Sequence, residues 1–428
     1  MNESFLHYVW QMQYFQKEGL ATTHGEPITV FKTGTPNKNA GPDFLQARIK
    51  IGNLEWNGHV EIHRKASDWQ AHHHQHDEAY NNVVLHVVWD ADQEMARADR
   101  TGLPCLELKS RVAPHLVHAY TQLVNSGAEI PCARSFPTVP PIYKTTMLER
   151  MVVERLEQKA EEILVILATH QHDWEQTAFQ VLARNFGFKV NAEPFARLAQ
   201  ALPWKLIAKY RHNALRVEAL IFGMAGFLET QMSDTYHEQL RREFQTLEAL
   251  HQLSGQKLKA SIWRFLRLRP ANFPTVRLAQ WSAWLSNQST LYTSLVEATH
   301  ARELFTLFRE TAGDYWHHHY RFGKKARAFQ PTLGFESIEN IIINTVAPLQ
   351  AAAGKWYGQH ELIERACALL QQLPAEKNQV TRLWTTLGWP ANSAFQSQGN
   401  IQLYRHYCEK RRCLSCAIGN QVLKPGQA

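Results

Sequence analysis

The sequence lacks the features that define membrane, secreted and fibrous proteins. No apolar run in its 428 residues approaches the roughly 20 residues of a membrane-spanning helix. Its first residues, MNESFLHYVWQMQYF, contain no basic region followed by an apolar one, as a signal peptide would. Six cysteines in a chain of this length are too few for a disulfide scaffold. We therefore expect a cytoplasmic protein that does not interact with a membrane.

The sequence also lacks the common fingerprints of nucleotide-binding and hydrolytic enzymes. It contains no Walker A loop, no glycine-rich dinucleotide motif and no G-x-S-x-G nucleophile elbow. Histidine, with 22 residues, and tryptophan, with 13, are unusually frequent, and many of the histidines cluster, which points to metal or proton-transfer chemistry. Lysine and arginine exceed aspartate and glutamate by 46 to 39, and this net charge of +7 is compatible with a nucleic-acid partner.

The first 110 residues contain a dense succession of predicted elements. These are a helix over 3–17, strands within 25–34, 43–52 and 54–63, a helix over 67–80, and strands at 81–90 and 103–110. Their order begins α-β-β-β-α-β. The helical crossover predicts that 54–63 and 81–90 pair in parallel, whereas the earlier hairpins predict antiparallel pairs.

The character of the sequence changes near residue 145, where long amphipathic helical segments begin. A proline-rich stretch, GAEIPCARSFPTVPPI, precedes the change and indicates a linker. We predict an α+β protein with an α/β domain at 1–126, a linker at 127–142, a mostly helical domain at 143–400 and a cysteine-containing segment at 401–428.

Two carboxylates give the strongest chemical signal. Asp43 begins one predicted strand and Glu61 lies on the next, so a hairpin can bring them together to hold Mg²⁺ or Mn²⁺. Strand alternation places Glu61, His63 and Lys65 on one face, where a basic group could orient or activate water. In the alternative interpretation, Asp43 only ends a turn and Glu61 is a solvated strand residue.

This arrangement resembles the PD-(D/E)XK nuclease superfamily, through Pro42-Asp43, Glu61-x-His63 and the order of elements. The resemblance implies a restriction-endonuclease-like fold for the first domain. It also implies that Asp43, Glu61 and the main-chain carbonyl of Ile62 bind the metal. His63 stands where the superfamily has lysine, and Lys65 is the candidate substitute. Glu107-Leu108-Lys109 is a literal E-x-K, but it lies beyond the strand at 81–90, where the superfamily order does not place it.

A histidine cluster follows the second carboxylate. If 67–80 is a helix, His72 and His76 share a face and can bind Zn²⁺ or Mn²⁺, and His73 and Asp77 form a similar pair. A histidine facing Glu61 would favour Mn²⁺ or another transition metal over Mg²⁺. The alternative is a polar surface helix, with His86 a structural histidine in a buried strand.

A second possible metal site lies at the C-terminal end. Cys408, Cys413 and Cys416 have a spacing that suits Zn²⁺ or an iron–sulfur cluster, with Cys132 the best fourth ligand and His406 the second choice. The alternative is three reduced cysteines on a basic tail. The other two cysteines, at positions 105 and 367, are expected in the core.

Basic and aromatic residues interleave in 257–274 and 316–329. Such segments can neutralise phosphates and stack on bases. The candidate nucleic-acid-binding residues are Arg264, Arg267, Arg269, Arg321, Lys324 and Lys325. For 257–268 the alternative is an amphipathic helix with Trp263, Phe265 and Leu266 in the core.

The chain as a whole resembles the bacterial family labelled domain of unknown function 2851. The resemblance is carried by GPDF, W-x-G-x-VEIH, SDW, Y-x-NVVLHVV, EALIFGMAGFL, RPANFP, LG-x-x-SIENIIINTVAP and C-x4-C-x2-C-x-IG. It covers nearly the full length and implies no established activity.

The sequence therefore favours a metal-dependent nuclease or phosphodiesterase acting on nucleic acid. Asp43 and Glu61 would hold the metal, and His63 would orient or activate water with Lys65 in reserve. One alternative is a catalytically inactive protein of nuclease fold that binds nucleic acid or a protein partner. Another is a histidine-based metal hydrolase of a small substrate.

Overall fold

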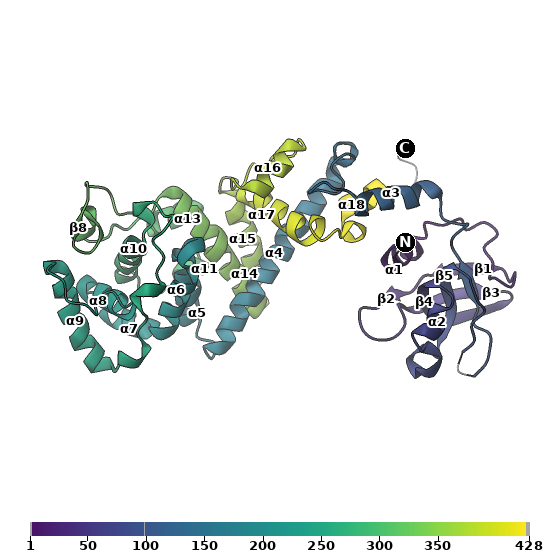
Figure 1. The fold of residues 1–428 in the computed structure, drawn as a ribbon, viewed down its shortest axis with the longest axis horizontal. Coiled ribbons are helices and arrows are strands. Elements are labelled where there is room, and N and C mark those ends of the chain that lie inside the picture. The colour runs from purple at the N-terminus through teal and green to yellow at the C-terminus, as the bar shows by residue number, and fades with distance from the viewer. Residues whose placement is uncertain (1, 98, 425–428) are drawn as a thin grey trace. The chain divides into compact units, whose positions relative to one another are not determined.

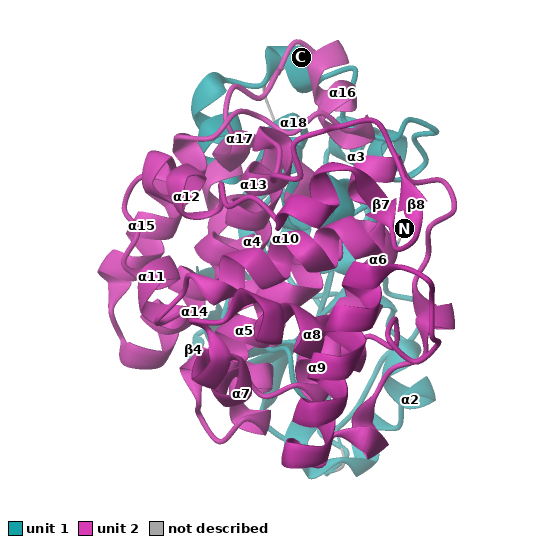
Figure 2. Cartoon of the chain, turned by 90° about the vertical axis from the view of Figure 1, so that its left-hand side faces the viewer, with its two compact units in different colours: residues 1–147, 403–428 teal, residues 148–402 magenta. Residues whose placement is uncertain are grey.

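The computed structural model describes residues 2–97 and 99–424. The chain divides into two compact units, one of residues 1–147 and 403–428 and the other of residues 148–402 (Figure 2). The predicted linker and residues 403–428 of the predicted C-terminal segment fall within the first unit. We call these unit 1 and unit 2 and describe each by itself.

Unit 1 contains a six-stranded sheet with short helices around it (Figure 1). Its strands are β1 (Ile28–Lys32), β2 (Thr35–Pro36), β3 (Phe44–Ile51), β4 (Leu54–Lys65), β5 (Val83–Asp90) and β6 (Cys105–Glu107). Its helices are α1 (Glu3–Met12), α2 (Asp68–Ala71), α3 (Pro114–Val124) and α18 (Ala417–Leu423). Single turns lie at His74–His76, Glu78–Tyr80, Phe136–Thr138, Tyr404–Cys408 and Cys413–Ser415.

The sheet is mixed, with strand order β1-β3-β4-β5-β6 and β2 paired to β3. β1, β2 and β4 pair with β3 in antiparallel fashion, whereas β4–β5 and β5–β6 are parallel. The predicted parallel crossover and antiparallel hairpin are therefore confirmed, and the α+β class with them. β4 lies between β3 and β5, so its side chains are flanked by neighbours on both edges.

Apolar patterning explains how this unit is built. The first six residues of β5, VVLHVV, are all buried, as expected for a β-branched strand covered on both faces. In α1, Asn2 caps the helix by accepting the N–H of Phe5, and Phe5 and Val9 are fully buried. α1 packs against β4. The helix therefore fixes one side of the strand on which the candidate site lies.

Arg411 joins the C-terminal segment of unit 1 to residues at the start of the predicted linker. Its guanidinium donates to the backbone carbonyls of Ala128 and Ser126 at 2.9 and 2.8 Å. α18 also packs against α3. These contacts bring residues 403–424 beside residues 114–136, which explains why segments far apart in sequence form one unit.

Unit 2 is mostly helical (Figure 1). Its helices are α4 (Pro141–Thr169, which begins in unit 1), α5 (Trp174–Phe186), α6 (Phe188–Ala201), α7 (Trp204–Tyr210), α8 (Ala214–Met224), α9 (Thr235–His251), α10 (Pro274–Ser286), α11 (Tyr292–Val296), α12 (Ala301–Leu307), α13 (Phe335–Ile341), α14 (Ala347–Tyr357), α15 (His360–Gln371), α16 (Gln379–Thr386) and α17 (Ala394–Leu403). A two-stranded ribbon joins β7 (His319–Arg321) to β8 (Lys324–Lys325). Single turns lie at Ser254–Gln256, Ala260–Ile262, Pro270–Asn272, Asp314–His317 and Ile342–Val346.

Buried aromatic rings dominate the core of unit 2. Trp281 on α10 is fully buried, and its ring stacks on Phe179 of α5 with centroids 5.1 Å apart. Phe195 of α6 meets the same ring at 5.6 Å. Such pairs bury large apolar areas and add a preference for defined ring geometry. Three helices are thereby locked around one tryptophan.

The amphipathic helix considered for residues 257–268 is wrong. The segment contains only short turns and irregular backbone, and Arg267 adopts a left-handed φ of 61°. Trp263 is nevertheless buried, with its Nε1 donating to the Ala225 carbonyl at 2.9 Å. Leu266, expected in the core, is 81% exposed. The buried Trp263 therefore fixes a segment of irregular backbone, which the helical pattern does not predict.

Among residues 2–97 and 99–424, no helix is both long enough and apolar enough to span a bilayer.

Glu218 on α8 is an ionisable group enclosed in the core of unit 2. Trp316 Nε1 donates to its Oε1 at 2.7 Å, and Tyr236 is a second hydrogen-bonding partner. Burial raises the pKa of Glu218 to about 7, against the lowering effect of these two bonds. The carboxyl group therefore titrates near neutral pH in the folded protein.

Glu218→Gln is expected to remove a pH dependence of stability. Between the ordinary value of 4.5 and about 7, the folded state binds the Glu218 proton more tightly than the unfolded state. Stability is therefore greatest at low pH and falls as the pH rises, by about 2 kcal/mol between pH 5 and pH 8. Thermal unfolding across this range should show the melting temperature of wild type falling relative to the variant by roughly 5 °C. Parallel profiles for the two proteins would contradict the assignment.

Candidate metal centre

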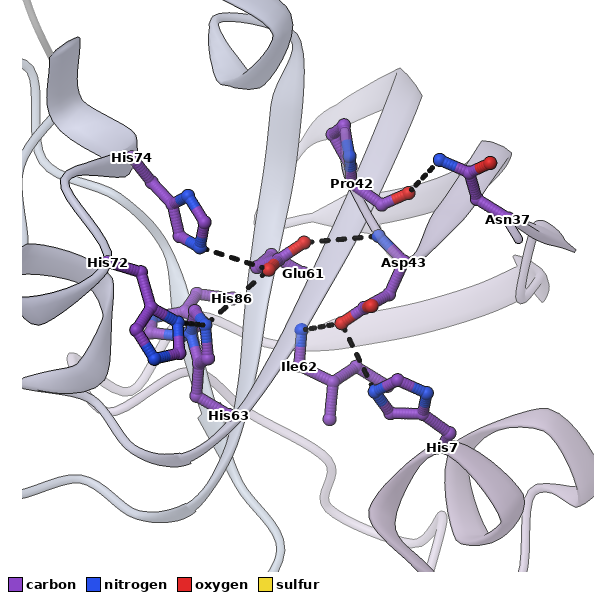
Figure 3. Close-up of polar contacts among 10 residues, drawn as sticks. All are labelled: His7, Asn37, Pro42, Asp43, Glu61, Ile62, His63, His72, His74 and His86. Atoms are coloured by element: carbon purple, nitrogen blue, oxygen red, sulfur yellow. Dashed lines mark hydrogen bonds and ion pairs between the residues drawn. The ribbon is translucent and has the colours of Figure 1, made fainter. Parts of the chain in front are cut away.

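The candidate site lies on β4, at its junction with β3 and β5 (Figure 3). Glu61 and His63 project from the same face of β4 because side chains alternate along a strand, and both are buried. In the parallel β4–β5 pair, Glu61 lies opposite His86. Asp43 directly precedes β3, after a turn in which Gly41 has a φ of 100°, a conformation natural to glycine. Three adjacent strands thus bring polar side chains to one place.

The predicted carboxylates lie side by side. The Asp43 N–H donates to Glu61 Oε2 at 3.1 Å, and the Ile62 N–H donates to Asp43 Oδ2 at 3.0 Å. His7 Nε2, from α1, lies 3.2 Å from the same Asp43 oxygen. Each carboxylate is therefore held by backbone of the neighbouring strand (Figure 3). The other Glu61 oxygen, Oε1, faces the histidines. The Ile62 carbonyl remains only a predicted ligand.

Two histidines contact Glu61 Oε1, and a third contacts one of these two. His74 Nε2 lies 3.3 Å and His63 Nε2 3.5 Å from this oxygen, and His72 Nδ1 is 3.2 Å from His63 Nε2. Each imidazole offers a nitrogen within 4.8 Å of the other two. Apart from its contact with Glu61, the buried His74 Nε2 has no hydrogen-bond partner among the described residues. This gathering of nitrogen atoms around a carboxylate oxygen is the donor set of a metal site.

His86 lies next to His63. Its ring is fully buried, and its Nε2 is 2.8 Å from His63 Nδ1. If His63 binds a metal through Nε2, its Nδ1 carries the hydrogen and donates to His86. Metal-ligating histidines usually make such an outer hydrogen bond, which fixes the tautomer and the ring orientation. The structure therefore places His86 in contact with the site.

Burial controls the protonation states of this cluster. It lowers the pKa of His63 to about 4, with the charges of His74 and His72 adding to the effect, and it lowers the pKa of His86 well below its usual value. Both rings are therefore neutral at pH 7, the form that binds metals. Burial also raises the pKa of Glu61, and the charge of Asp43 adds to it while His74 opposes it. A bound cation would stabilise the ionised carboxylate.

His7 and His74 were not among the site residues predicted from the sequence. His7 is carried in from α1, and although burial opposes it, the hydrogen bond with Asp43 and the Asp43 charge raise the pKa of His7. The only signal for His7 was a polar residue between Leu6 and Tyr8, both of which are buried. His74 belonged to the visible histidine cluster, but helical spacing favoured its neighbours.

The helix predicted over 67–80 is wrong in its extent. α2 ends at Ala71, His73 adopts a left-handed φ of 60°, and two single turns follow. Ser67 does not cap α2, because its hydroxyl donates to Asp92 Oδ2 at 2.7 Å. The predicted pairing of His73 with Asp77 on a helical face therefore does not exist.

Because α2 ends at Ala71, a different histidine from the predicted one reaches Glu61. His76, predicted to pair with His72, is exposed and is not part of the histidine group. His74 takes that place, and its ring stacks on Tyr80 with centroids 3.8 Å apart. Only His72 of the two predicted histidine ligands lies at the site.

The lysines considered for catalysis lie elsewhere. Lys65 is at the exposed end of β4, where its backbone N–H donates to Asp68. Glu107, from the alternative E-x-K motif, accepts the Ala91 N–H, and Lys109 pairs with Asp90 at 3.2 Å. These contacts lie along the β5–β6 edge, so the motif has a structural explanation.

The four cysteines proposed as ligands are buried in unit 1. Burial raises the pKa of Cys132 to about 12, and the charges of Cys416 and Cys413 contribute to this shift. The cysteines are therefore near enough to influence one another. Burial and the same neighbours raise the pKa of Cys408 well above its usual value. Among the described residues, however, the sulfur atoms do not form a group at metal-binding distance. A zinc or iron–sulfur site here, with or without His406, remains a prediction.

The six basic residues predicted to bind nucleic acid all belong to unit 2. Arg264, Arg267, Arg269, Lys324 and Lys325 are exposed. Arg321 is half-buried, with its guanidinium 4.0 Å above the ring of Phe265 and 4.7 Å from that of Phe273. Exposure leaves five of them accessible to phosphates, and their role remains a prediction.

The donor set fits a transition metal better than Mg²⁺. Three imidazoles suit Zn²⁺, Mn²⁺ or Fe²⁺, whereas Mg²⁺ prefers oxygen ligands and water. His63, His72 and His74 would hold the ion, and the Glu61 carboxylate lies beside two of them. Asp43 lies next to this set but directs its Oδ2 towards Ile62 and His7.

The comparisons with known proteins concern the whole chain. No curated protein and no solved structure matches it. The family described as "Protein of unknown function (DUF2851)" matches residues 3–379, which include the candidate metal centre and most of unit 2. The chain therefore belongs to the DUF2851 family.

Proposed function

We propose that this chain is a metal-dependent hydrolase that cleaves phosphodiester bonds in nucleic acid. The observation that carries the proposal is the group of His63, His72 and His74, of which His63 and His74 also contact one oxygen of buried Glu61. Buried carboxylates and neutral histidines are costly to assemble without a function, because each must be desolvated. A metal ion is the partner that their chemistry favours.

Each residue of the cluster has a definable part in such a reaction. A bound divalent ion would supply a Lewis acid for a phosphoryl oxygen and lower the pKa of a water molecule. Asp43 contacts His7 and, although burial opposes it, this contact raises the pKa of His7, which makes His7 a candidate proton donor beside the carboxylates. His86 fixes the orientation of His63.

A phosphodiester substrate is supported by three features. The order predicted from the sequence, α-β-β-β-α-β, is that of the PD-(D/E)XK nucleases, and under that resemblance Asp43 and Glu61 would take the positions of their metal-binding carboxylates. The net charge of +7 and the exposed basic residues of unit 2 favour a polyanion. Histidine in place of lysine implies that positive charge at the reacting phosphate comes from the ion.

A nuclease assay tests the proposal directly. The full chain is incubated with single- and double-stranded DNA, RNA and a chromogenic phosphodiester, in the presence of Mg²⁺, Mn²⁺, Zn²⁺ or EDTA. A His63→Ala protein, purified in parallel, controls for contaminating nuclease. We expect cleavage with Mn²⁺ or Zn²⁺ that EDTA and the substitution both abolish. Equal cleavage by the two proteins, or none by folded wild type, would contradict the proposal and favour a binding protein.

The three-histidine set also favours a second candidate, a metal hydrolase of a small substrate. Lys65, the basic residue predicted to assist at the phosphate, is exposed and does not join the cluster. A protein that turns over the chromogenic diester or small esters with metal, but neither cleaves nor binds nucleic acid, would have this second function.

A further inference from the structure

A buried arginine without a counter-charge lies in a pocket of unit 2. Arg277 is in the first turn of α10 and only 7% exposed. The pocket that it lines has a volume of about 290 Å³, and its walls include Phe188, Asn191, Asn272 and Asn340. All of these residues belong to unit 2, so the pocket shares no residue with the metal centre and its chemistry does not depend on the proposed function.

The contacts of the Arg277 guanidinium are all with neutral groups. Nη1 donates to Gln280 Oε1 at 3.0 Å, and Nη2 donates to Asn272 Oδ1 at 2.6 Å and to Ser337 Oγ at 3.0 Å. The Phe188 ring lies over the guanidinium with its centroid 4.4 Å away. Nε is buried and has no partner among the described residues. The side chain is therefore held in place with hydrogen-bonding capacity to spare.

No carboxylate among the described residues forms an ion pair with Arg277. Burial alone lowers the pKa of the Arg277 guanidinium to about 10, with no charged neighbour raising it. Glu336, the acidic residue of the pocket lining, is exposed and is not a partner of the guanidinium. A buried cation is costly unless it is paired, and hydrogen bonds to neutral groups compensate it only in part. An anion entering the pocket would supply the missing charge.

The rest of the pocket suits a phosphate attached to a small organic group. Arginine predominates at phosphate sites because its guanidinium donates charge-assisted hydrogen bonds to phosphate oxygens, and the Arg277 Nε–H, which has no partner among the described residues, is free to donate one. Phe188 offers an aromatic surface, and the Asn272 and Asn340 amides add polar groups. Asn191 exchanges two hydrogen bonds with the backbone of Arg264, which fixes the wall of the pocket. Glu336 could accept hydrogen bonds from sugar hydroxyls.

We propose that this pocket binds a phosphate group, with Arg277 as the phosphate-binding residue. The phosphate could come from inorganic phosphate or from a nucleoside monophosphate. Because the pocket adds an aromatic ring and amides to the cation, the nucleotide binds more tightly than inorganic phosphate.

Calorimetric titration of the full chain in EDTA tests this site without the metal centre. The probes are inorganic phosphate, AMP and adenosine at constant ionic strength. We expect saturable binding of AMP, weaker binding of phosphate and none of adenosine. Tight binding of phosphate with no gain for AMP would make the ligand phosphate itself. No binding of either anion, or equal binding of adenosine and AMP, would overturn the proposal.

Substitution of the arginine gives the second part of the test. Arg277→Met keeps the apolar stem of the side chain and removes the guanidinium, and we expect AMP affinity to fall by about 30-fold or more. Arg382→Met, an exposed position on α16, makes the same change of net charge and should leave affinity unchanged. If Arg277→Met does not fold, Asn340→Asp, which adds a negative charge to the wall, should weaken AMP about tenfold. Unchanged affinity in the folded variants would overturn the assignment.

Discussion

Glu61→Gln is expected to lower the rate of metal-dependent hydrolysis by roughly 1,000-fold or more. The substitution keeps the size of the side chain and an oxygen that can accept the Asp43 N–H, so the strand arrangement is preserved. It removes the negative charge on which His63 and His74 converge. An amide oxygen binds divalent ions far more weakly than a carboxylate does. The measurement is the initial rate with Mn²⁺ or Zn²⁺ on the best substrate of the panel.

Glu55→Gln is the matched control for this substitution. Glu55 lies on the same strand, but it is exposed and pairs with Arg48 on the surface. The control protein should retain wild-type activity within about threefold, since exposed ion pairs contribute little. Activity in Glu61→Gln as high as in Glu55→Gln would show that Glu61 takes no part in catalysis. Thermal unfolding of both proteins excludes misfolding as the reason for any loss.

The carboxylate part of the site could be predicted from sequence because it depends on strand pairing. Asp43 and Glu61 flank one hairpin, and the two-residue period of a strand determines that Glu61 and His63 share a face. The parallel crossover to 81–90 followed from the length of the connection. Local rules were sufficient here, since neighbouring strands in sequence are also neighbours in the sheet.

Other parts of the site depend on tertiary contacts that no spacing rule contains. His7 reaches Asp43 only because α1 packs on β4. The helix predicted over 67–80 does not form over its full length. Ser67 donates to Asp92 and does not cap α2 with its side chain, and His73 adopts a left-handed conformation. In unit 2, the pattern at 257–268 left a helix as the alternative because Trp263 and Leu266 are three residues apart, as on one helical face. Instead, the buried Trp263 and the two hydrogen bonds between Asn191 and the Arg264 backbone anchor that segment.

The structure assigns His74 as a metal ligand, whereas the helix predicted over 67–80 assigned His76. Substitution of each histidine distinguishes the two assignments. His74→Ala is expected to weaken Zn²⁺ or Mn²⁺ binding by about 100-fold or more, because the ion loses a direct ligand. His76→Ala should change the affinity by less than about threefold, since its exposed ring is outside the histidine group. Helical pairing of His72 with His76 would give the opposite order. Competition with a chromogenic chelator measures both affinities on the full chain.

His72→Ala tests whether the effect of His74→Ala is purely structural. His74 stacks on Tyr80 and meets Trp69 edge-on at 5.4 Å, so its loss also removes packing. His72, by contrast, is exposed, and His72→Ala should preserve the fold while removing a ligand of the same group. We expect His72→Ala to weaken metal binding about as much as His74→Ala does, with an unchanged melting temperature in the metal-free protein. Weakened binding in His74→Ala alone would mean that the ring acts through packing and that the ion is not held by this set.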